Sequence, residues 1–241
     1  ILLCFYVNKM SYLDIKITPK QAEEILFQLY AIVGKASELP GEVDFNFRIK
    51  TEGASEDYIL KVSRPEEDES YLEYQQELLE YVAKTENVIA PKVIHDKKEN
   101  NISEYNDVNG NVRKVRLLSW IPGRLWSSVN PQNNSLRYSL GNECGKLTKA
   151  LLGFDHKEAH RNFEWDVAQS LWTKDYLELF DIEQRNIITK FQELFENQLE
   201  GYTQLRKSVV HNDANDNNVV VNANLRTPEV VAAIDYGDAI H

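Results

Sequence analysis

The sequence is poor in cysteine and in clusters of metal-binding side chains. Its 241 residues include two cysteines, Cys4 and Cys144, with no Cys-x-x-Cys pair and no group of histidines. Two cysteines exclude a disulfide framework and argue against a structural zinc site. A reducing compartment is the simplest fit, and we therefore expect a cytoplasmic protein.

Positive charge is also scarce. The chain has 27 lysine and arginine residues against 38 aspartate and glutamate residues, which gives a formal net charge of −11 at pH 7. Proteins that bind nucleic acid usually present a basic face, so this balance argues against a nucleic-acid partner. It does not argue against nucleotide binding, because a few local cations and Mg2+ are enough to hold a nucleotide.

The apolar run that opens the sequence, at residues 1–7, is too short to span a bilayer and has no basic segment before it. It predicts neither a signal peptide nor a membrane anchor, and we expect no membrane partner. We assign residues 1–17 to an N-terminal extension. Met10 is the only methionine, so residues 1–9 are either an upstream extension or the edge of a fragment.

The stretch richest in reactive side chains is residues 208–241. It reads as a strand that enters a polar loop, a Val-rich strand at 218–221, a turn, and a second apolar strand at 230–234 that ends in Asp-Tyr-Gly-Asp. Two acid-bearing loops therefore lie at the ends of adjacent strands. The alternative is an ordinary hairpin rich in Asn and Asp, which would leave the fixed spacing of its polar residues unexplained.

That spacing is His211-x-Asp213-x4-Asn218, followed by Asp235. It matches the arrangement of phosphoryl-transfer enzymes, in which one Asp aligns the acceptor hydroxyl while an Asn and a second Asp hold Mg2+. We therefore predict Asp213 as the catalytic residue and Asn218 and Asp235 as the Mg2+ ligands. His211 belongs to the same catalytic loop, and we expect it to brace the loop rather than to react.

The two motifs, HNDANDNN at 211–218 and IDYGD at 234–238, resemble the aminoglycoside phosphotransferase and choline kinase superfamily. Within it they are most similar to the hydroxylysine-kinase-like branch, which includes kinase modules fused to a class III aminotransferase. They differ from protein kinases at Asn212, where those carry Arg, and at Tyr236, where those carry Phe. The resemblance runs from about Thr18 to the end of the chain.

The resemblance implies an α+β fold of the two-lobed protein-kinase type. We expect an N-terminal nucleotide-binding lobe at 18–122, with an antiparallel sheet and one helix, and a mainly helical C-terminal catalytic lobe with a catalytic hairpin at 123–241. Members of the superfamily continue past the metal motif into further helices, so the second lobe is expected to be incomplete. The chain would then be a truncated product or a piece of a longer, multi-enzyme polypeptide, with a fused or associated aminotransferase as a possible partner.

The hydrophobic periodicity supports this order of elements. The Thr-Pro pair at residues 18–19 predicts the start of a helix, and Asn109-Gly110 predicts a tight hairpin. The predicted helices are 18–33, 66–84, 135–152, 163–180 and 182–201, and the five predicted strands of the first lobe are 36–50, 58–62, 90–95, 102–105 and 112–120.

The segment Leu39–Phe47 resembles the phosphate-covering loop of the hydroxylysine-kinase-like branch, which implies nucleotide contacts for Asp44, Asn46 and Phe47. Lys61 stands among apolar residues of the next strand. A lone strand lysine is usually exposed, but in this order it fits the lysine that neutralises the α- and β-phosphates.

Such a lysine needs a carboxylate to orient it, and the helix at 66–84 is expected to supply one. The Leu-Glu-x-Gln context of the superfamily points to Glu73, with Glu77 as the alternative. Solvent exposure is the ordinary state of either side chain.

The segment that leaves the last strand of the first lobe is expected to be the hinge. Backbone groups of Ser119, Trp120 and Ile121 would bind the nucleobase, and Ile234, next to the metal aspartate, would complete the nucleotide site. The alternative for 119–121 is a plain strand end.

We therefore expect a small-molecule kinase that transfers the γ-phosphoryl group of ATP or GTP to a hydroxyl of an amino-bearing metabolite, such as hydroxylysine or an amino alcohol. Asp216 and Asp238 beside the centre would suit a cationic acceptor. Trp126 and Trp165 could add an aromatic face, although both fit a core position better. The alternatives are a nucleotide-binding pseudokinase module without turnover and a choline or aminoglycoside kinase.

Overall fold

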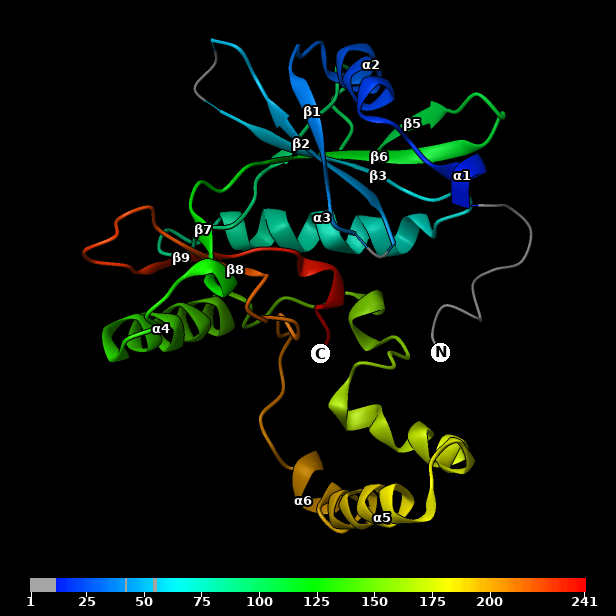
Figure 1. Cartoon of the computed structure of the whole chain (residues 1–241), viewed down its shortest axis with the longest axis vertical. Helices are drawn as coiled ribbons and strands as arrows, with labels where there is room; N and C mark the ends of the chain where they lie inside the picture. Colours follow the sequence, from blue (N-terminus) through cyan, green and yellow to red (C-terminus); the bar gives the residue numbers. More distant parts are fainter. Residues whose placement is uncertain (1–11, 42, 54–55) are drawn as a thin grey trace.

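A computed structural model describes residues 12–41, 43–53 and 56–241. The opening apolar run, Cys4 and Met10 lie outside the described residues, as does position 42 of the predicted phosphate-covering loop. The described chain begins with a short helix, α1 (Tyr12–Ile15). Figure 1 shows two successive bodies: an antiparallel sheet held between two helices, and below it a small sheet with the remaining helices.

The first sheet has six antiparallel strands, one more than expected, because the predicted strand at 36–50 is divided in two. The break lies at Pro40-Gly41, where proline has no N–H for the ladder and a Cβ on Gly41 would meet the Asp44 carbonyl oxygen at 2.6 Å. The strand order is β1-β2-β3-β6-β4, with β5 paired to β6. The bounds are β1 (Lys35–Leu39), β2 (Phe45–Lys50), β3 (Tyr58–Val62), β4 (Val93–Ile94), β5 (Ser103–Asn106) and β6 (Val112–Ser119).

One face of this sheet is apolar and is covered by helix α2 (Pro19–Tyr30). The predicted helix start is confirmed: Thr18 caps α2 in a capping box with Gln21. Phe47 is buried in this apolar face together with Leu60 and Leu117. A nucleotide contact through the Phe47 side chain is therefore wrong, because strand alternation turns that side chain away from the face that carries Lys61.

The opposite face carries a polar row. The register pairs Asn46 with Lys61 and Lys61 with Arg116, so these side chains lie side by side across β2, β3 and β6. Helix α3 (Glu69–Ala83) lies on this side of the sheet, as Figure 1 shows. Its predicted stripe is confirmed as the buried one and consists of Leu72, Gln75, Leu79 and Val82.

The chain leaves the first sheet after Ser119 and enters a three-stranded antiparallel sheet of order β7-β8-β9 at Arg124. A Cβ on Gly123, between them, would meet the Val221 carbonyl oxygen at 2.5 Å, so only glycine fits this passage. The bounds are β7 (Arg124–Leu125), β8 (Val219–Val221) and β9 (Val230–Ala233), and helix α4 (Asn134–Ala150) packs beside β9. Strand β7 was not predicted.

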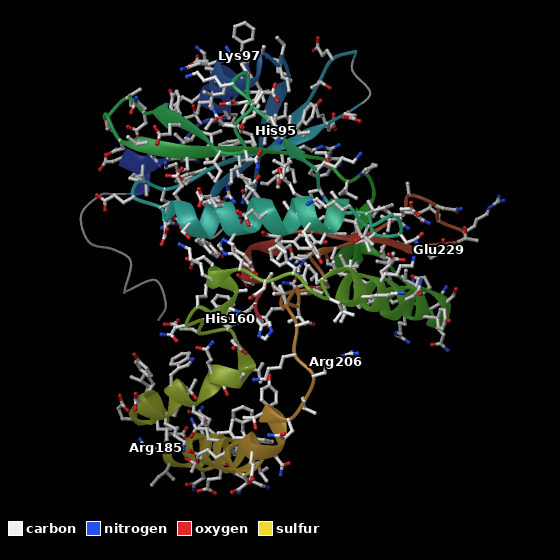
Figure 2. All side chains as sticks on the ribbon, turned by 180° about the vertical axis from the view of Figure 1, so that it is seen from behind. His95, Lys97, His160, Arg185, Arg206 and Glu229 are labelled. Carbon is white, nitrogen blue, oxygen red and sulfur yellow. The ribbon has the colours of Figure 1, made fainter. Side chains whose placement is uncertain are left out.

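The remaining helices form a separate hairpin. After η3 (Lys157–His160), the expected α-helix at 163–180 is instead the 3-10 helix η4 (Val167–Leu179). No residue of η4 is buried, and nothing in its sequence explains the 3-10 form. Helices α5 (Ile182–Glu196) and α6 (Leu199–Thr203) follow, and Figure 2 shows Arg185 in this hairpin, with Arg206 on the segment that returns to the catalytic strands. No helix of the described residues combines the length and apolarity that crossing a membrane requires.

A buried ion pair holds the start of β6 in place. Arg113 is 1% exposed, and its guanidinium Nε donates to Asp107 Oδ2 at 2.8 Å. The same guanidinium donates to the carbonyl oxygens of Ser63 at 3.0 Å and Ile15 at 2.8 Å. Burial raises the pKa of Asp107, but hydrogen bonds from Asn111 and Arg113 outweigh it, so the pKa lies below its ordinary value.

We predict that Asp107→Asn lowers the free energy of unfolding by about 3–5 kcal/mol at neutral pH, because it leaves a buried guanidinium without its counter-charge. A carboxyl whose pKa is depressed by folding contributes stability above its unfolded value of 3.8, and this contribution is lost as the pH falls through the folded value. Urea unfolding should therefore show a smaller difference between wild type and variant at about pH 3 than at pH 7.

The matched control is Asp57→Asn, because Asp57 pairs with Arg48 at 2.8 Å near the surface. Its loss should stay below about 1 kcal/mol. Equal losses for the two variants would contradict the role assigned to burial.

Candidate active site

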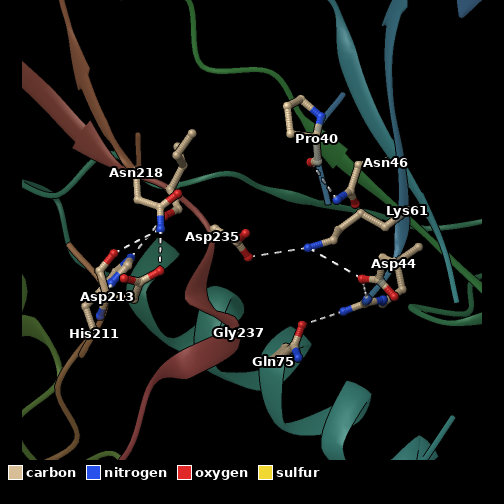
Figure 3. Close-up of polar contacts among 12 residues, drawn as sticks. Pro40, Asp44, Asn46, Lys61, Gln75, His211, Asp213, Asn218, Asp235 and Gly237 are labelled. Carbon is tan, nitrogen blue, oxygen red and sulfur yellow. Dashed lines mark hydrogen bonds and ion pairs between the residues drawn. The ribbon is translucent and has the colours of Figure 1, made fainter. Parts of the chain in front are cut away.

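Lys61 lies between two carboxylates that come from distant parts of the chain. Its side chain is 14% exposed, and its Nζ is 3.6 Å from Asp44 Oδ2 and 3.4 Å from Asp235 Oδ1 (Figure 3). Asp44 belongs to the loop between β1 and β2, and Asp235 lies two residues after the end of β9. The structure thus brings three predicted site residues together.

Arg116 lies beside Lys61 and was not predicted as a site residue. Its side chain is 1% exposed, its Nη1 donates to Gln75 Oε1 at 2.6 Å, and its Nη2 donates to Asp44 Oδ2. Figure 3 shows its two partners, Gln75 and Asp44, near the Lys61 ammonium. Arg116 therefore connects the loop at Asp44 to helix α3.

The predicted pair of Lys61 with Glu73 is wrong. Glu73 and its alternative Glu77 are both exposed on the outer side of α3. The buried stripe of the helix presents Gln75 and Gln76 to the sheet instead. Within the described residues, the carboxylates in ion-pair distance of Lys61 are Asp44 and Asp235.

The predicted phosphate-covering loop lies close to Lys61, as Figure 3 shows for Pro40 and Asn46. Asn46 Nδ2 donates to the Pro40 carbonyl oxygen at 3.3 Å, and Arg64 Nε donates to the Val43 carbonyl oxygen at 3.0 Å. These bonds hold both sides of the loop against the sheet.

Two of the three predicted hinge residues already use their N–H groups. Ser119 N–H donates to the Lys92 carbonyl oxygen and Trp120 N–H to the Asp57 carbonyl oxygen, both at 2.9 Å. The Trp120 ring is covered by the Arg48 guanidinium at 4.2 Å from its centroid. Ile121 is half-buried, and its N–H donates no hydrogen bond to another described residue.

The catalytic loop is held by its own asparagines. Asn218 Nδ2 donates to Asp213 Oδ2 at 2.7 Å and to the Asp213 carbonyl oxygen at 3.0 Å, while Asn215 Nδ2 donates to Asp213 Oδ1 at 2.8 Å. Asn212 has a φ of 64°, a left-handed conformation that asparagine tolerates better than most residues. Both carboxylate oxygens of Asp213 are therefore oriented before any ligand binds.

His211 joins the loop that contains Asp213 to Ile234, directly after β9. Its Nε2 lies 3.1 Å from the Ile234 carbonyl oxygen, and its Nδ1 lies 3.3 Å from the Asp213 N–H. A neutral ring with its proton on Nε2 satisfies both contacts, and burial lowers the pKa of His211. The expectation that His211 braces the loop agrees with these bonds.

Asp235, two residues after the end of β9, has a left-handed backbone conformation. Asp235 has a φ of 61° and a side chain that is 52% exposed, and the Lys61 charge holds its pKa below the ordinary value. Ile234 N–H donates to the Asn218 carbonyl oxygen at 2.8 Å, so the two predicted metal-ligand segments are bonded directly. Asn218 and Asp235 offer oxygen ligands, which suit Mg2+, although no cluster of three or more acidic, His or Cys ligands is present in the part of the chain that is described.

The segment after Asp235 is clamped by α3. Tyr71 Oη donates to the Gly237 carbonyl oxygen at 2.5 Å and Tyr74 Oη to the Ala239 carbonyl oxygen at 3.0 Å. Arg161 Nη1 also donates to the Ala239 carbonyl oxygen, at 2.8 Å, and its guanidinium packs on both tyrosine rings. No local sequence signal connects these residues, which are more than 70 positions apart.

A cavity of about 20 Å3 lies behind Lys61. Gln76, Arg116 and Tyr236 line it, and each has buried polar atoms without a hydrogen-bond partner among the described residues. A polar cavity of this size has room for about one water molecule.

The residues predicted for the acceptor side separate into core and surface. Trp126 is buried in an apolar cluster with Val129 and Leu136, so the core reading is confirmed for it and its role as an acceptor face is wrong. Trp165 is 63% exposed, and its carbonyl oxygen accepts from Asn212 Nδ2 at 3.4 Å, beside the catalytic loop. Asp216 is exposed, and Asp238 is half-buried.

We predict that the His211 imidazole titrates below its ordinary value of 6.5. Burial disfavours the charged ring, so on acidification the imidazole is protonated in the unfolded chain before it is protonated in the folded one. The contribution of neutral His211 to the free energy of unfolding therefore falls as the pH drops from 6.5 to the pKa of the folded state. Nitrogen-detected NMR should show a neutral ring protonated on Nε2 at pH 6.5. A ring that is mostly cationic at that pH would contradict the assignment.

Comparisons with known proteins agree with this geometry. The sequence family described as "Phosphotransferase enzyme family" matches residues 35–240. No curated protein matches the chain. The match confirms the superfamily and the phosphotransferase class predicted from the two motifs, while the hydroxylysine-kinase-like branch stays a prediction.

Several solved structures share the fold. An amicoumacin kinase in complex with AMP-PNP, Ca2+ and Ami superposes with a TM-score of 0.69 and 16% identity over 95% of this chain and 67% of that one. A microcompartment-associated aminopropanol kinase gives 0.69 and 16% over 91% of this chain and 69% of that one. The GDP and kanamycin complex of APH(2")-IIia gives 0.64 and 15% over 90% and 72%.

These structures confirm the kinase-like α+β fold. The family match covers most of the sequence and includes the sheet with Lys61, the catalytic loop and the metal strand. The chain belongs to the phosphotransferase enzyme family.

Proposed function

We propose that the chain transfers the γ-phosphoryl group of ATP or GTP to a hydroxyl group of a small, amino-bearing molecule. The observation that carries the proposal is one continuous polar network. Lys61 is 3.4 Å from Asp235, and the neighbour of Asp235, Ile234, donates its N–H to the Asn218 carbonyl oxygen. The Asn218 side chain in turn donates to Asp213. The complexes of similar structures with AMP-PNP and Ca2+ and with GDP support a nucleotide donor and a divalent cation.

Lys61 would neutralise the α- and β-phosphates. Asn218 and Asp235 would hold Mg2+ through their oxygens, and the ion would supply further neutralisation of phosphate charge when bound. The pKa of Asp235 lies below its ordinary value because of Lys61, so its carboxylate is ionised and ready to bind a cation at neutral pH. The N–H of Ile121 would donate to the nucleobase, and the Ile234 side chain would contact the nucleotide.

Asp213 would align the acceptor. Its carboxylate, fixed by Asn215 and Asn218, would accept the proton of the acceptor hydroxyl. The acceptor oxygen forms a bond to the γ-phosphorus as the bond from that phosphorus to the β–γ bridging oxygen breaks, and the nucleoside diphosphate leaves. Most of the rate acceleration would come from positioning and charge neutralisation.

A cationic acceptor fits the surroundings of Asp213. Asp216 is exposed on the same loop, and the exposed Trp165 lies beside it with a ring that could cover an ammonium group. The named acceptors of similar proteins, aminopropanol and kanamycin, carry amino groups, which supports the same class here.

We predict that Asp213→Asn lowers kcat by about 10²–10⁴-fold and changes the affinity for Mg2+-nucleotide little, because the residue acts on the hydroxyl proton. Asp235→Asn should weaken Mg2+-dependent nucleotide binding as well. Coupled release of ADP or GDP measures turnover, and calorimetry measures binding. Wild-type rates in both variants would refute the catalytic assignment, and nucleotide binding without turnover in the wild type would favour a pseudokinase.

We predict that amino alcohols and hydroxy amino acids are phosphorylated faster than neutral sugars at matched concentration, because an acidic surface attracts cations. A panel of acceptors at low and high salt tests this, and the preference should shrink as salt screens the charges. Faster turnover of neutral sugars would exclude the cationic acceptor.

A further inference from the structure

We propose that Asp44 and Arg116 are positioning residues for Lys61, and that they perform the task usually expected of a helix glutamate. The inference rests on the proposed function. Asp44 Oδ2 contacts both the Lys61 ammonium and the Arg116 guanidinium, whereas the glutamates of α3 at positions 73 and 77 face solvent.

The strand register creates the need for this carboxylate. Lys61 on β3 pairs with Arg116 on β6, so two cationic side chains lie next to each other on one face of the sheet. Both are well covered, at 14% and 1% exposure, and buried like charges without an anion are strongly unfavourable. Asp44, at 9% exposure, supplies the anion between them.

The contacts divide the work between the two cations. Arg116 makes close hydrogen bonds to Asp44 and to Gln75 of α3. The Lys61 ammonium is 3.6 Å from Asp44, which is longer than an ordinary hydrogen bond. Arg116 therefore anchors Asp44, and Lys61 is oriented by the anchored carboxylate. One Lys61 N–H donates to Asp235 Oδ1 at 3.4 Å, and the other donors would bind phosphate oxygens.

The same anchor fixes the loop above the site. Asp44 ends the segment that begins at Pro40, and Asn46 Nδ2 closes that segment on the Pro40 carbonyl oxygen at 3.3 Å. A Cβ built on Gly41 would lie 2.6 Å from the Asp44 carbonyl oxygen, so the Gly41 and Asp44 backbones are close together. Release of Asp44 from Arg116 would therefore disturb Gly41 as well as Lys61.

The negative charge of Asp44 allows a clear test, because two explanations predict opposite changes in nucleotide affinity when that charge is removed. The Asp44 carboxylate lies in ion-pair distance of two cations, Lys61 and Arg116. A simple Coulomb argument says that removing an anion near bound phosphates tightens nucleotide binding. Positioning predicts the opposite sign, because Lys61 and the loop lose their anchor.

The experiment compares Asp44→Asn with Asp107→Asn, since each removes the counter-charge of a buried β6 arginine, Arg116 or Arg113. We expect Asp44→Asn to raise both the Kd for Mg2+-AMP-PNP and the KM for the donor about tenfold, and to lower kcat about tenfold. Asp107→Asn should lower the melting temperature and leave Kd, KM and kcat within about twofold.

A double variant, Asp44→Asn with Arg116→Met, leaves no unpaired guanidinium and keeps the test open where the single variant does not fold. It should show the same weakened binding. Unchanged or tighter nucleotide binding in either Asp44 variant, or equal effects of Asp107→Asn on Kd, would overturn the proposal. Calorimetric Kd values decide it separately from turnover, so a wild type that binds nucleotide but transfers no phosphoryl group would overturn only the proposed function. A wild type that binds no nucleotide would overturn both.

Discussion

The Lys61 ammonium joins the two bodies of the molecule through charge. It lies 3.6 Å from Asp44, in the loop between β1 and β2, and 3.4 Å from Asp235 after the last strand. Neither contact is short, so the ammonium interacts with both carboxylates and forms a close hydrogen bond to neither. The arrangement gives a partly buried cation near-neutral surroundings, while the close bonds that hold it in place belong to the neighbouring Arg116.

Much of the site could be predicted because its signals are local. The loop from His211 to Asn218 contains both Asp213, the proposed catalytic aspartate, and the amide that orients it, five residues apart, so spacing alone brings them together. The buried stripe of α3 could also be predicted from helical periodicity. That stripe already contained Gln75 and excluded Glu73. The pairing of Lys61 with Glu73 was predicted from the family context, against this periodicity.

The rest depends on long-range pairing that no local pattern specifies. The register of β3 on β6 sets Arg116 beside Lys61 across 55 positions of sequence, and a shift of one residue would place Arg116 on the apolar face instead. The division of the first strand at Pro40-Gly41 had a visible signal, since proline interrupts a ladder. The 3-10 form of η4 had no such signal, because its sequence has the residues of an α-helix.

The clamp between α3 and the segment after Asp235 has a thermodynamic consequence. Gln75 holds Arg116 at one side of the site, while Tyr71 and Tyr74 of the same helix hold Gly237 and Ala239 at the other. Helix α3 therefore connects the two sides of the site through hydrogen bonds. If a nucleotide changed the affinity for a cation through this connection, the cation would have to change the affinity for the nucleotide by the same factor.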